Sequence, residues 1–306
     1  MTTMRRWFLY VAAIYVVGFT VAGVELARLS MIMPRRPMAN AALIEERYRQ
    51  SFNAKVEDVS VNAADGADLR GWFVTPAKTN GESVVLLHGI GDNRIGMSGF
   101  ADLFLARGYA VLLPDSRGHG ESGGEAATYG VLERDDVRRW VAWMRGREPG
   151  CTYLMGESMG AAIGLQATAV TPQLCAVAVE SPFAHFRTTG YERMGWMTHT
   201  GTLFWKTLGR PVIETAILWG RIRYGVWLTE ADPQAAIEHS KVPALLIAGT
   251  VDRNIPMHNA QELEKACGAR CELWIIPGAD HGGASSVAPE EFQRRVAGWF
   301  EEHDHR

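Results

Sequence analysis

The most constraining feature of this 306-residue sequence is a series of short apolar runs that alternate with helical patterns. The runs are SVVLLHG, YAVLLPD, CTYLMGE, LCAVAVES, VPALLIAGT and CELWIIPG. Each has the length of a strand and ends at turn residues, as is typical of strands buried on both faces. Helices are predicted between them, for residues 98–107, 131–145, 159–170, 259–267 and 290–302. The alternation predicts an α/β protein with a mostly parallel central sheet and helices on both faces.

Two segments depart from this alternation. VEDVSVNAADGADLRGWFVTP has two alternating halves around Asp65 and Gly66, which predicts a β-hairpin. The tryptophan-rich stretch from Phe183 to Thr229 lacks strand character and is too long for an ordinary crossover. We therefore expect an α/β core in residues 55–182 and 231–306, with a helical cap insertion at 183–230.

The N-terminal segment WFLYVAAIYVVGFTVAGV, residues 7–24, contains eighteen residues without a charge. At about 1.5 Å per residue it nearly crosses a hydrocarbon core of about 30 Å. We expect a single-pass membrane anchor in residues 1–30, followed by a connector at 31–54. A cleaved signal peptide is the main alternative, although only VAG resembles a cleavage site, and a buried core helix is a further one. Arginines flank both ends, so the side of the membrane on which the main domain lies stays open.

Composition limits the remaining classes. The chain is 47% hydrophobic and 21% charged with a net charge of −3, so it has no basic footprint for a nucleic-acid partner. Cys151 and Cys175 begin apolar runs and are expected to be buried thiols rather than a bridge. Cys267 and Cys271 have no further Cys or His at ligand spacing, so no zinc site is predicted.

The stretch GESMG places Ser158 between Gly156 and Gly160, where a buried strand passes into a helix. This GxSxG pattern is typical of a nucleophile elbow, a strained turn that exposes a serine at the edge of a sheet. A serine nucleophile needs a histidine base, which in turn needs an acid to orient it. Asp252 lies 94 residues after Ser158, and His281 lies 29 residues after Asp252, each just beyond a predicted strand.

With these motifs the chain resembles an α/β-hydrolase from roughly Val56 to Phe300, through LLHG, DSRGHGES, GESMG, GTVDRNIP and DHGG. The resemblance implies Ser158 as nucleophile, Asp252 as acid and His281 as base. In particular, the chain is similar to membrane-anchored lysophospholipase-like or acylglycerol-lipase-like hydrolases with a short cap. Glu180, at the end of another predicted strand, is an alternative acid.

Acyl transfer also needs an oxyanion hole, built from backbone N–H groups aimed at the carbonyl oxygen. We expect one from Met159, directly after the nucleophile, and one from Ile90 in the loop after LLHG. His88, next to Gly89, is expected to hold that loop by hydrogen bonds. The loop after the next strand is expected to be tied together by the side chains of Asp115, Arg117 and His119.

The sequence therefore predicts a serine hydrolase of carboxyl esters that forms an acyl-enzyme without a metal or organic cofactor. The anchor and four cap tryptophans, Trp196, Trp205, Trp219 and Trp227, favour a lipophilic or lipid-like ester, although these rings could instead pack the cap on the core. Peptides, amides and thioesters remain alternative substrates, because one triad serves all of them. A catalytically silent, membrane-anchored binding protein is the alternative from another class. GHGESG formally fits the glycine-rich motif of dinucleotide-binding proteins. However, it does not join the end of a strand directly to the start of a helix, as that motif requires.

Overall fold

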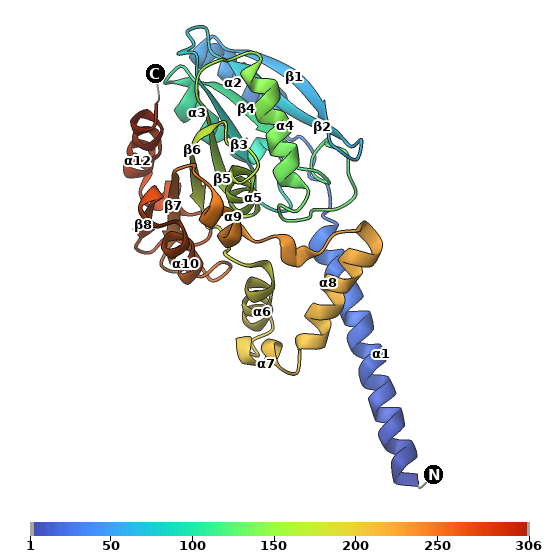
Figure 1. The fold of residues 1–306 in the computed structure, drawn as a ribbon. Coiled ribbons are helices and arrows are strands. Elements are labelled where there is room, and N and C mark those ends of the chain that lie inside the picture. Colours follow the sequence, from blue (N-terminus) through green and yellow to red (C-terminus); the bar gives the residue numbers. More distant parts are fainter. Residues whose placement is uncertain (1–2, 305–306) are drawn as a thin grey trace.

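The computed structural model describes residues 3–304 (Figure 1). Its centre is one eight-stranded sheet with the order β1-β2-β4-β3-β5-β6-β7-β8. The strands are β1 (Lys55–Asn62), β2 (Asp68–Thr75), β3 (Ser83–Leu87), β4 (Ala110–Pro114), β5 (Thr152–Glu157), β6 (Leu174–Glu180), β7 (Ala244–Gly249) and β8 (Cys271–Ile276). From β4 to β8 all neighbouring pairs are parallel, whereas β1, β2 and β4 pair antiparallel. The predicted mostly parallel sheet is confirmed.

The hairpin predicted around Asp65 and Gly66 joins β1 and β2, with Val59 opposite Gly71 in the register. Gly66 has φ 85°, a left-handed conformation that glycine adopts without a side-chain clash. Its N–H donates to the carbonyl of Ala63 at 3.0 Å, which closes the turn.

Helices cover both faces of the sheet because the central strands are apolar on both sides. Val84 and Leu86 face one core with α3 (Ser98–Leu105) and α12 (Pro289–Glu302). Val85 and Leu87 face the other core, with α4 (Glu133–Arg145), α5 (Met159–Thr168), α9 (Pro233–His239) and α10 (His258–Cys267). The five predicted helices are confirmed, with ends that differ by a few residues. Short elements complete the core: η1 (Arg94–Met97), η2 (Leu228–Glu230), η3 (Gly268–Arg270) and α11 (Ala284–Val287).

The segment predicted as a connector contains a helix that packs on the core. This helix, α2 (Ala41–Phe52), buries Ile44 and Tyr48. The hydroxyl of Tyr48 donates to the carbonyl of Ser98 at 2.9 Å, which ties α2 to the start of α3.

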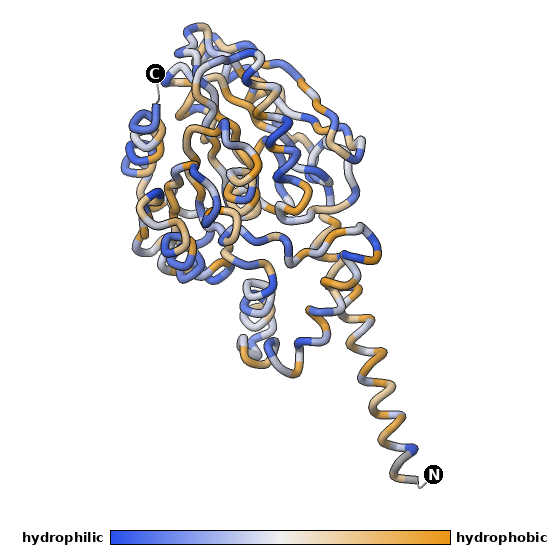
Figure 2. Tube along the Cα trace, in the orientation of Figure 1, coloured by the Kyte–Doolittle hydropathy of each residue, from blue (hydrophilic) through white to orange (hydrophobic). Residues whose placement is uncertain are grey.

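Between β6 and β7 the chain forms α6 (Phe186–Met197), α7 (Thr202–Lys206) and α8 (Arg210–Tyr224). In Figure 1 these helices lie below the sheet, and α8 runs beside the upper part of α1 (Thr3–Met31). The lower part of α1 extends away from the rest of the molecule, and Figure 2 shows that it is largely hydrophobic. Residues 6–31 of this helix are long and apolar enough to cross a membrane, a test that a signal sequence would also pass.

The prediction that Cys151 and Cys175 are buried thiols was wrong. Cys151 and Cys175 form a disulfide, with their Cα atoms 5.7 Å apart, and Cys267 and Cys271 form a second one, at 5.8 Å. The parallel pairing of β5 with β6 brings the first residues of both strands together, which puts Cys151 next to Cys175. This pairing could not be predicted from either apolar run alone, because it depends on β5 and β6 being neighbours in the sheet.

Candidate active site

The turn around Ser158 is a sharp reversal between β5, which ends at Glu157, and α5, which begins at Met159. Ser158 has φ 54° and ψ −112°, a conformation that is costly for a residue with a side chain and recurs at functional sites. A Cβ atom on Gly160 would lie 2.2 Å from the carbonyl oxygen of Leu87, and one on Gly156 would lie 2.4 Å from that of Gly160. Only glycine fits at either position.

The loops that follow β5, β7 and β8 bring Ser158, Asp252 and His281 together. The Oγ of Ser158 lies 2.8 Å from Nε2 of His281, and Nδ1 of His281 lies 2.8 Å from Oδ2 of Asp252. The carboxylate of Asp252 can only accept, so Nδ1 carries the ring proton and Nε2 accepts from the serine hydroxyl. The three residues predicted from their order in the sequence thus form one continuous chain of hydrogen bonds.

Asp252 is held as a carboxylate. Its side chain is almost fully buried, and its Oδ1 accepts from the amides of Asn254 and Ile255, both at 2.9 Å. Burial alone would raise the pKa of Asp252, but the hydrogen bonds from His281 and from the Ile255 amide outweigh it and lower the pKa below its usual value. A negative charge next to His281 would stabilise the imidazolium form of the ring.

His88 organises the loop after β3. Its Nδ1 donates to the carbonyl of Gly89 at 2.8 Å, and its Nε2 accepts from the amide of Ser116 at 3.0 Å. Burial lowers the pKa of His88 to about 4, so the ring stays neutral and keeps both roles.

The two predicted oxyanion donors belong to the two segments that meet at Ser158. Met159 is the first residue of α5, and Ile90 lies two residues beyond the loop residue His88. A Cβ atom on Gly89 would be 3.5 Å from the Cβ of Ser158, which shows how closely that loop approaches the serine. Among residues 3–304 the amides of Ile90 and Met159 have no hydrogen bond to a protein acceptor. Both are therefore free to donate to a ligand.

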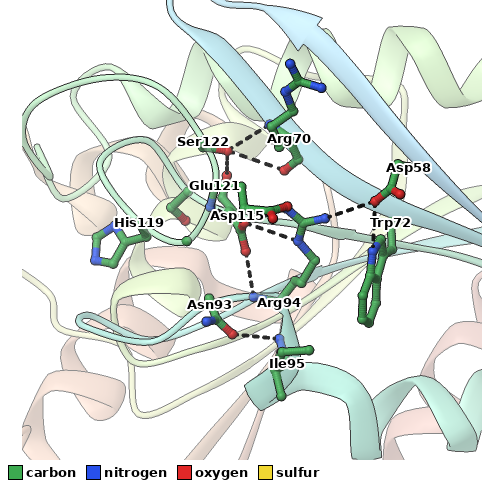
Figure 3. A network of polar contacts seen from close by, with 12 residues as sticks. Asp58, Arg70, Trp72, Asn93, Arg94, Ile95, Asp115, His119, Glu121 and Ser122 are labelled. Atoms are coloured by element: carbon green, nitrogen blue, oxygen red, sulfur yellow. Dashed lines mark hydrogen bonds and ion pairs between the residues drawn. The ribbon is translucent and has the colours of Figure 1, made fainter. Parts of the chain in front are cut away.

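A buried ion pair fixes the far end of this loop (Figure 3). Arg94 donates through Nε and Nη2 to Oδ2 of Asp115 at 3.1 and 2.7 Å, and both side chains are almost fully buried. Oδ1 of Asp115 also accepts from the amide of Arg94 at 2.8 Å. Nε2 of His119 accepts from the amide of Gly91 at 3.1 Å. These contacts hold the segment that contains Ile90 against the loop after β4.

Sequence reasoning predicted that Asp115, Arg117 and His119 tie that loop together, and it missed Arg94. Arg117 binds Asp136 of α4 through two hydrogen bonds, at 2.8 and 2.7 Å. The only sequence signal for Arg94 is a charged residue shortly after a strand, which is common on exposed loops.

Two further carboxyl groups lie near His281. Glu180, at the end of β6, accepts from the amide of Ala284 at 2.8 Å through Oε1, while its Oε2 has no hydrogen-bond partner among the described residues. Burial raises the pKa of Glu180 to about 7, and burial also raises the pKa of Glu157. It is Asp252, and not Glu180, that hydrogen-bonds to the imidazole. This geometry favours Asp252 over the alternative acid.

The four tryptophans between β6 and β7 have different surroundings. Trp205 is buried, packs beside Phe204, and donates through Nε1 to the hydroxyls of Thr198 and Thr200. Trp196 and Trp227 are exposed, and Trp219 is half-buried. At least Trp205 therefore serves the packing of these helices rather than an acyl pocket.

Comparison with known proteins gives consistent results. The sequence model of the alpha/beta hydrolase family matches residues 84–295. The uncharacterised protein YqkD of Bacillus subtilis (strain 168) is 28% identical over 249 residues, which are 77% of this chain and 76% of YqkD. The Pyrococcus furiosus esterase Pf2001 is similar in structure, with a TM-score of 0.71 at 24% identity over 90% of this chain and 98% of the esterase. A putative lipase from Acinetobacter baumannii AYE has a TM-score of 0.59 at 15% identity, over 87% of this chain and 96% of the lipase. The predicted α/β-hydrolase fold is thereby confirmed.

Proposed function

Because this chain belongs to the alpha/beta hydrolase family, we propose that it is a serine hydrolase that cleaves carboxyl esters. Ser158 is the nucleophile, His281 the general base and Asp252 the acid that orients it. The observation that carries this proposal is the unbroken hydrogen-bonded chain from Ser158 through His281 to Asp252, with both contacts at 2.8 Å. It starts from a serine in a strained turn at the end of a central strand, the geometry of a nucleophile elbow, with the base that a serine nucleophile needs beside it.

In the first half-reaction, Nε2 of His281 takes the hydroxyl proton while Oγ of Ser158 attacks the ester carbonyl. The amides of Ile90 and Met159 stabilise the oxyanion of the tetrahedral intermediate. The charge of Asp252 stabilises the imidazolium. His281 then gives its proton to the leaving alcohol, and an acyl-serine remains. Water, activated by the same histidine, releases the acid and restores Ser158.

We infer that the substrate is lipophilic or lipid-like. Three observations support this: the apolar helix α1, the esterase and putative lipase among the structural relatives, and the exposed apolar side chains of residues 183–230. In this proposal residues 183–230 form the cap, 55–182 and 231–306 the core, and 1–30 a single-pass anchor. Hydrolysis of peptides, amides or thioesters by the same triad is the runner-up. The similarity to lysophospholipase-like and acylglycerol-lipase-like hydrolases belongs to this proposal too.

The test is turnover of p-nitrophenyl esters of increasing acyl length by the detergent-solubilised full chain. Ser158→Ala and His281→Gln should lower kcat by about 10⁴-fold or more, because the triad acts as a unit. Ser286→Ala, at an exposed serine, is the matched control and should leave kcat unchanged. A substrate preference for longer acyl chains supports the lipophilic ester. Turnover retained in Ser158→Ala contradicts the mechanism, and a folded wild type without any turnover favours the silent binding protein.

A further inference from the structure

Outside α1, the exposed large apolar side chains of the described residues are concentrated in the segment between β6 and β7. Among the described residues, seven lie within residues 183–230, whereas the much longer core at 55–182 and 231–306 has only Val170, Val251 and Val287. On α7, on α8 and between them, Leu203, Leu208, Leu218 and Ile222 are 75%, 63%, 47% and 69% exposed. Several exposed apolar side chains on two helices in contact with each other are typical of a surface that meets an apolar partner.

The same segment is attached to α1. A Cβ atom on Gly23 would lie 2.5 Å from the Cβ of Thr215 and 2.7 Å from the carbonyl oxygen of Val212, so α1 and α8 are in close backbone contact. Phe19 and Leu26 of α1 pack against the buried cluster of Tyr191, Trp205, Val212, Ile213 and Ile217. The hydroxyl of Tyr15 donates to the carbonyl of Leu208 at 3.4 Å. The helices α1 and α8 therefore form one unit.

This attachment fixes the depth of α8. The uncharged residues 7–24 of α1 span about 27 Å, so nearly all of them are needed to cross a hydrocarbon core of about 30 Å. Tyr15, Phe19 and Gly23 lie inside that stretch. Leu208, just before α8, and Val212, near its start, are their neighbours and must then lie below the surface of the membrane.

Charge favours the same arrangement. Residues 1–40 and 183–230 together contain eleven basic and four acidic residues, whereas the rest of the chain contains twenty basic and thirty acidic ones. Where α1 ends, a cavity of about 430 Å³ is lined by Arg28, Arg35 and Arg223 together with Glu125. Arg223 pairs with Glu125 and Arg28 with Glu25, both at 3.0 Å, so the three arginines exceed the acidic residues beside them by one charge. A basic surface at that level attracts anionic lipid headgroups.

We propose that α7 and α8 insert their exposed apolar side chains into the leaflet of an anionic phospholipid bilayer through which α1 passes. The chain is then held in the membrane at two places, by a spanning helix and by a segment that enters one leaflet. This inference rests on the proposal that α1 stays in the membrane, but it does not depend on ester hydrolysis.

Site-directed spin labelling of the full chain in vesicles tests it. All four native cysteines are disulfide-bonded, so one introduced cysteine is the only free thiol. Labels replace Leu208 and Leu218. A label at Ile14 of α1 is the lipid reference, and one at Val287 is the aqueous reference. Val287 matches Leu218 because the two side chains are similarly exposed, at 50% and 47%. We expect collisions with oxygen to exceed collisions with an aqueous nickel chelate at Leu208, Leu218 and Ile14, and the reverse at Val287. The same ratios are expected in the Ser158→Ala background, which separates this result from catalysis.

The other outcomes overturn the proposal. If the labels at Leu208 and Leu218 give the same collision ratio as the label at Val287 while the label at Ile14 stays in lipid, then α8 lies in water. If the labels at Leu208 and Leu218 show spin–spin broadening and meet neither oxygen nor the nickel chelate, then a second copy of the chain covers this surface. A label at Ile14 that meets the nickel chelate freely would remove the anchor and the insertion together. Replacing a phosphatidylglycerol–phosphatidylcholine mixture by phosphatidylcholine alone should lower the oxygen-to-nickel ratio at Leu218, and an unchanged ratio would refute the role of anionic headgroups.

Discussion

Glu180 is the residue whose environment conflicts most with its charge. It is 2% exposed, receives one hydrogen bond from Ala284, and lies close enough to Glu157 and Asp252 to be affected by their charges. Burial raises its pKa from 4.5 to about 7. Between these two values the folded chain keeps a proton that the unfolded chain has lost, so stability falls as the pH rises through this window.

Glu180→Gln should therefore stabilise the protein more at pH 8 than at pH 5. The expected difference is at most about 3 kcal/mol in the free energy of unfolding, from about 1.4 kcal/mol for each pKa unit. Urea denaturation at both pH values measures it, and the exposed Glu262→Gln is the control that should show no such difference. An equal effect of Glu180→Gln at pH 5 and pH 8 would refute the assignment of a raised pKa.

At the residue scale, the sequence could predict those candidate site residues whose chemistry and order along the chain are distinctive. Ser158, Asp252 and His281 could be predicted because each follows a strand and because the chemistry needs all three. Arg94 could not, because its partner Asp115 is recognisable only once β3 and β4 are side by side. The Cys151–Cys175 disulfide was missed for the same reason, since it depends on β5 and β6 being neighbours.

At the element scale, the elbow between β5 and α5 is tightly constrained by backbone contacts. Gly160→Ala would place a Cβ atom 2.2 Å from the Leu87 carbonyl oxygen and 2.8 Å from that of His88, both backbone atoms with no freedom to rotate away. We expect a loss of more than about 2 kcal/mol in the free energy of unfolding, since such strain is among the large mutational effects.

The matched control is Gly190→Ala, in the middle of α6, where an added Cβ would meet nothing within 4 Å. Alanine favours the helix over glycine, so this variant should gain up to about 1 kcal/mol. Chemical denaturation of both variants decides the matter. The account of the elbow fails if Gly160→Ala is as stable as the wild type.

Elements with a strong period or a strong turn signal could be predicted, and those whose formation depends on packing could not. The parallel strands, the hairpin and the five core helices follow from local pattern. The helix α2 was missed because its charged sequence, ALIEERYRQ, resembles a surface connector until Tyr48 is seen buried against Ser98. The association of α8 with α1 joins segments that are nearly two hundred residues apart, which no local pattern reports.

At the scale of the whole molecule, one disulfide links the starts of β5 and β6, and the other links the end of α10 to the start of β8. We expect thiol titration of the unfolded, unreduced protein to find no free thiol, and four after reduction. Reduction should also lower stability by about 3 kcal/mol, mainly through the Cys151–Cys175 bridge, whose residues are 24 apart in sequence. Finding four thiols before reduction, in protein purified from an oxidising compartment, would contradict the pairing.

The central claim is that the whole fold serves to activate Ser158, and covalent labelling tests it most directly. The purified full chain is treated with a fluorophosphonate probe, and the modified peptide is identified by mass spectrometry. We expect one label per chain, on Ser158, and none in Ser158→Ala, because only a serine next to a general base reacts readily with such a probe. A folded wild-type chain that fails to react, or that reacts at another residue, would contradict the account.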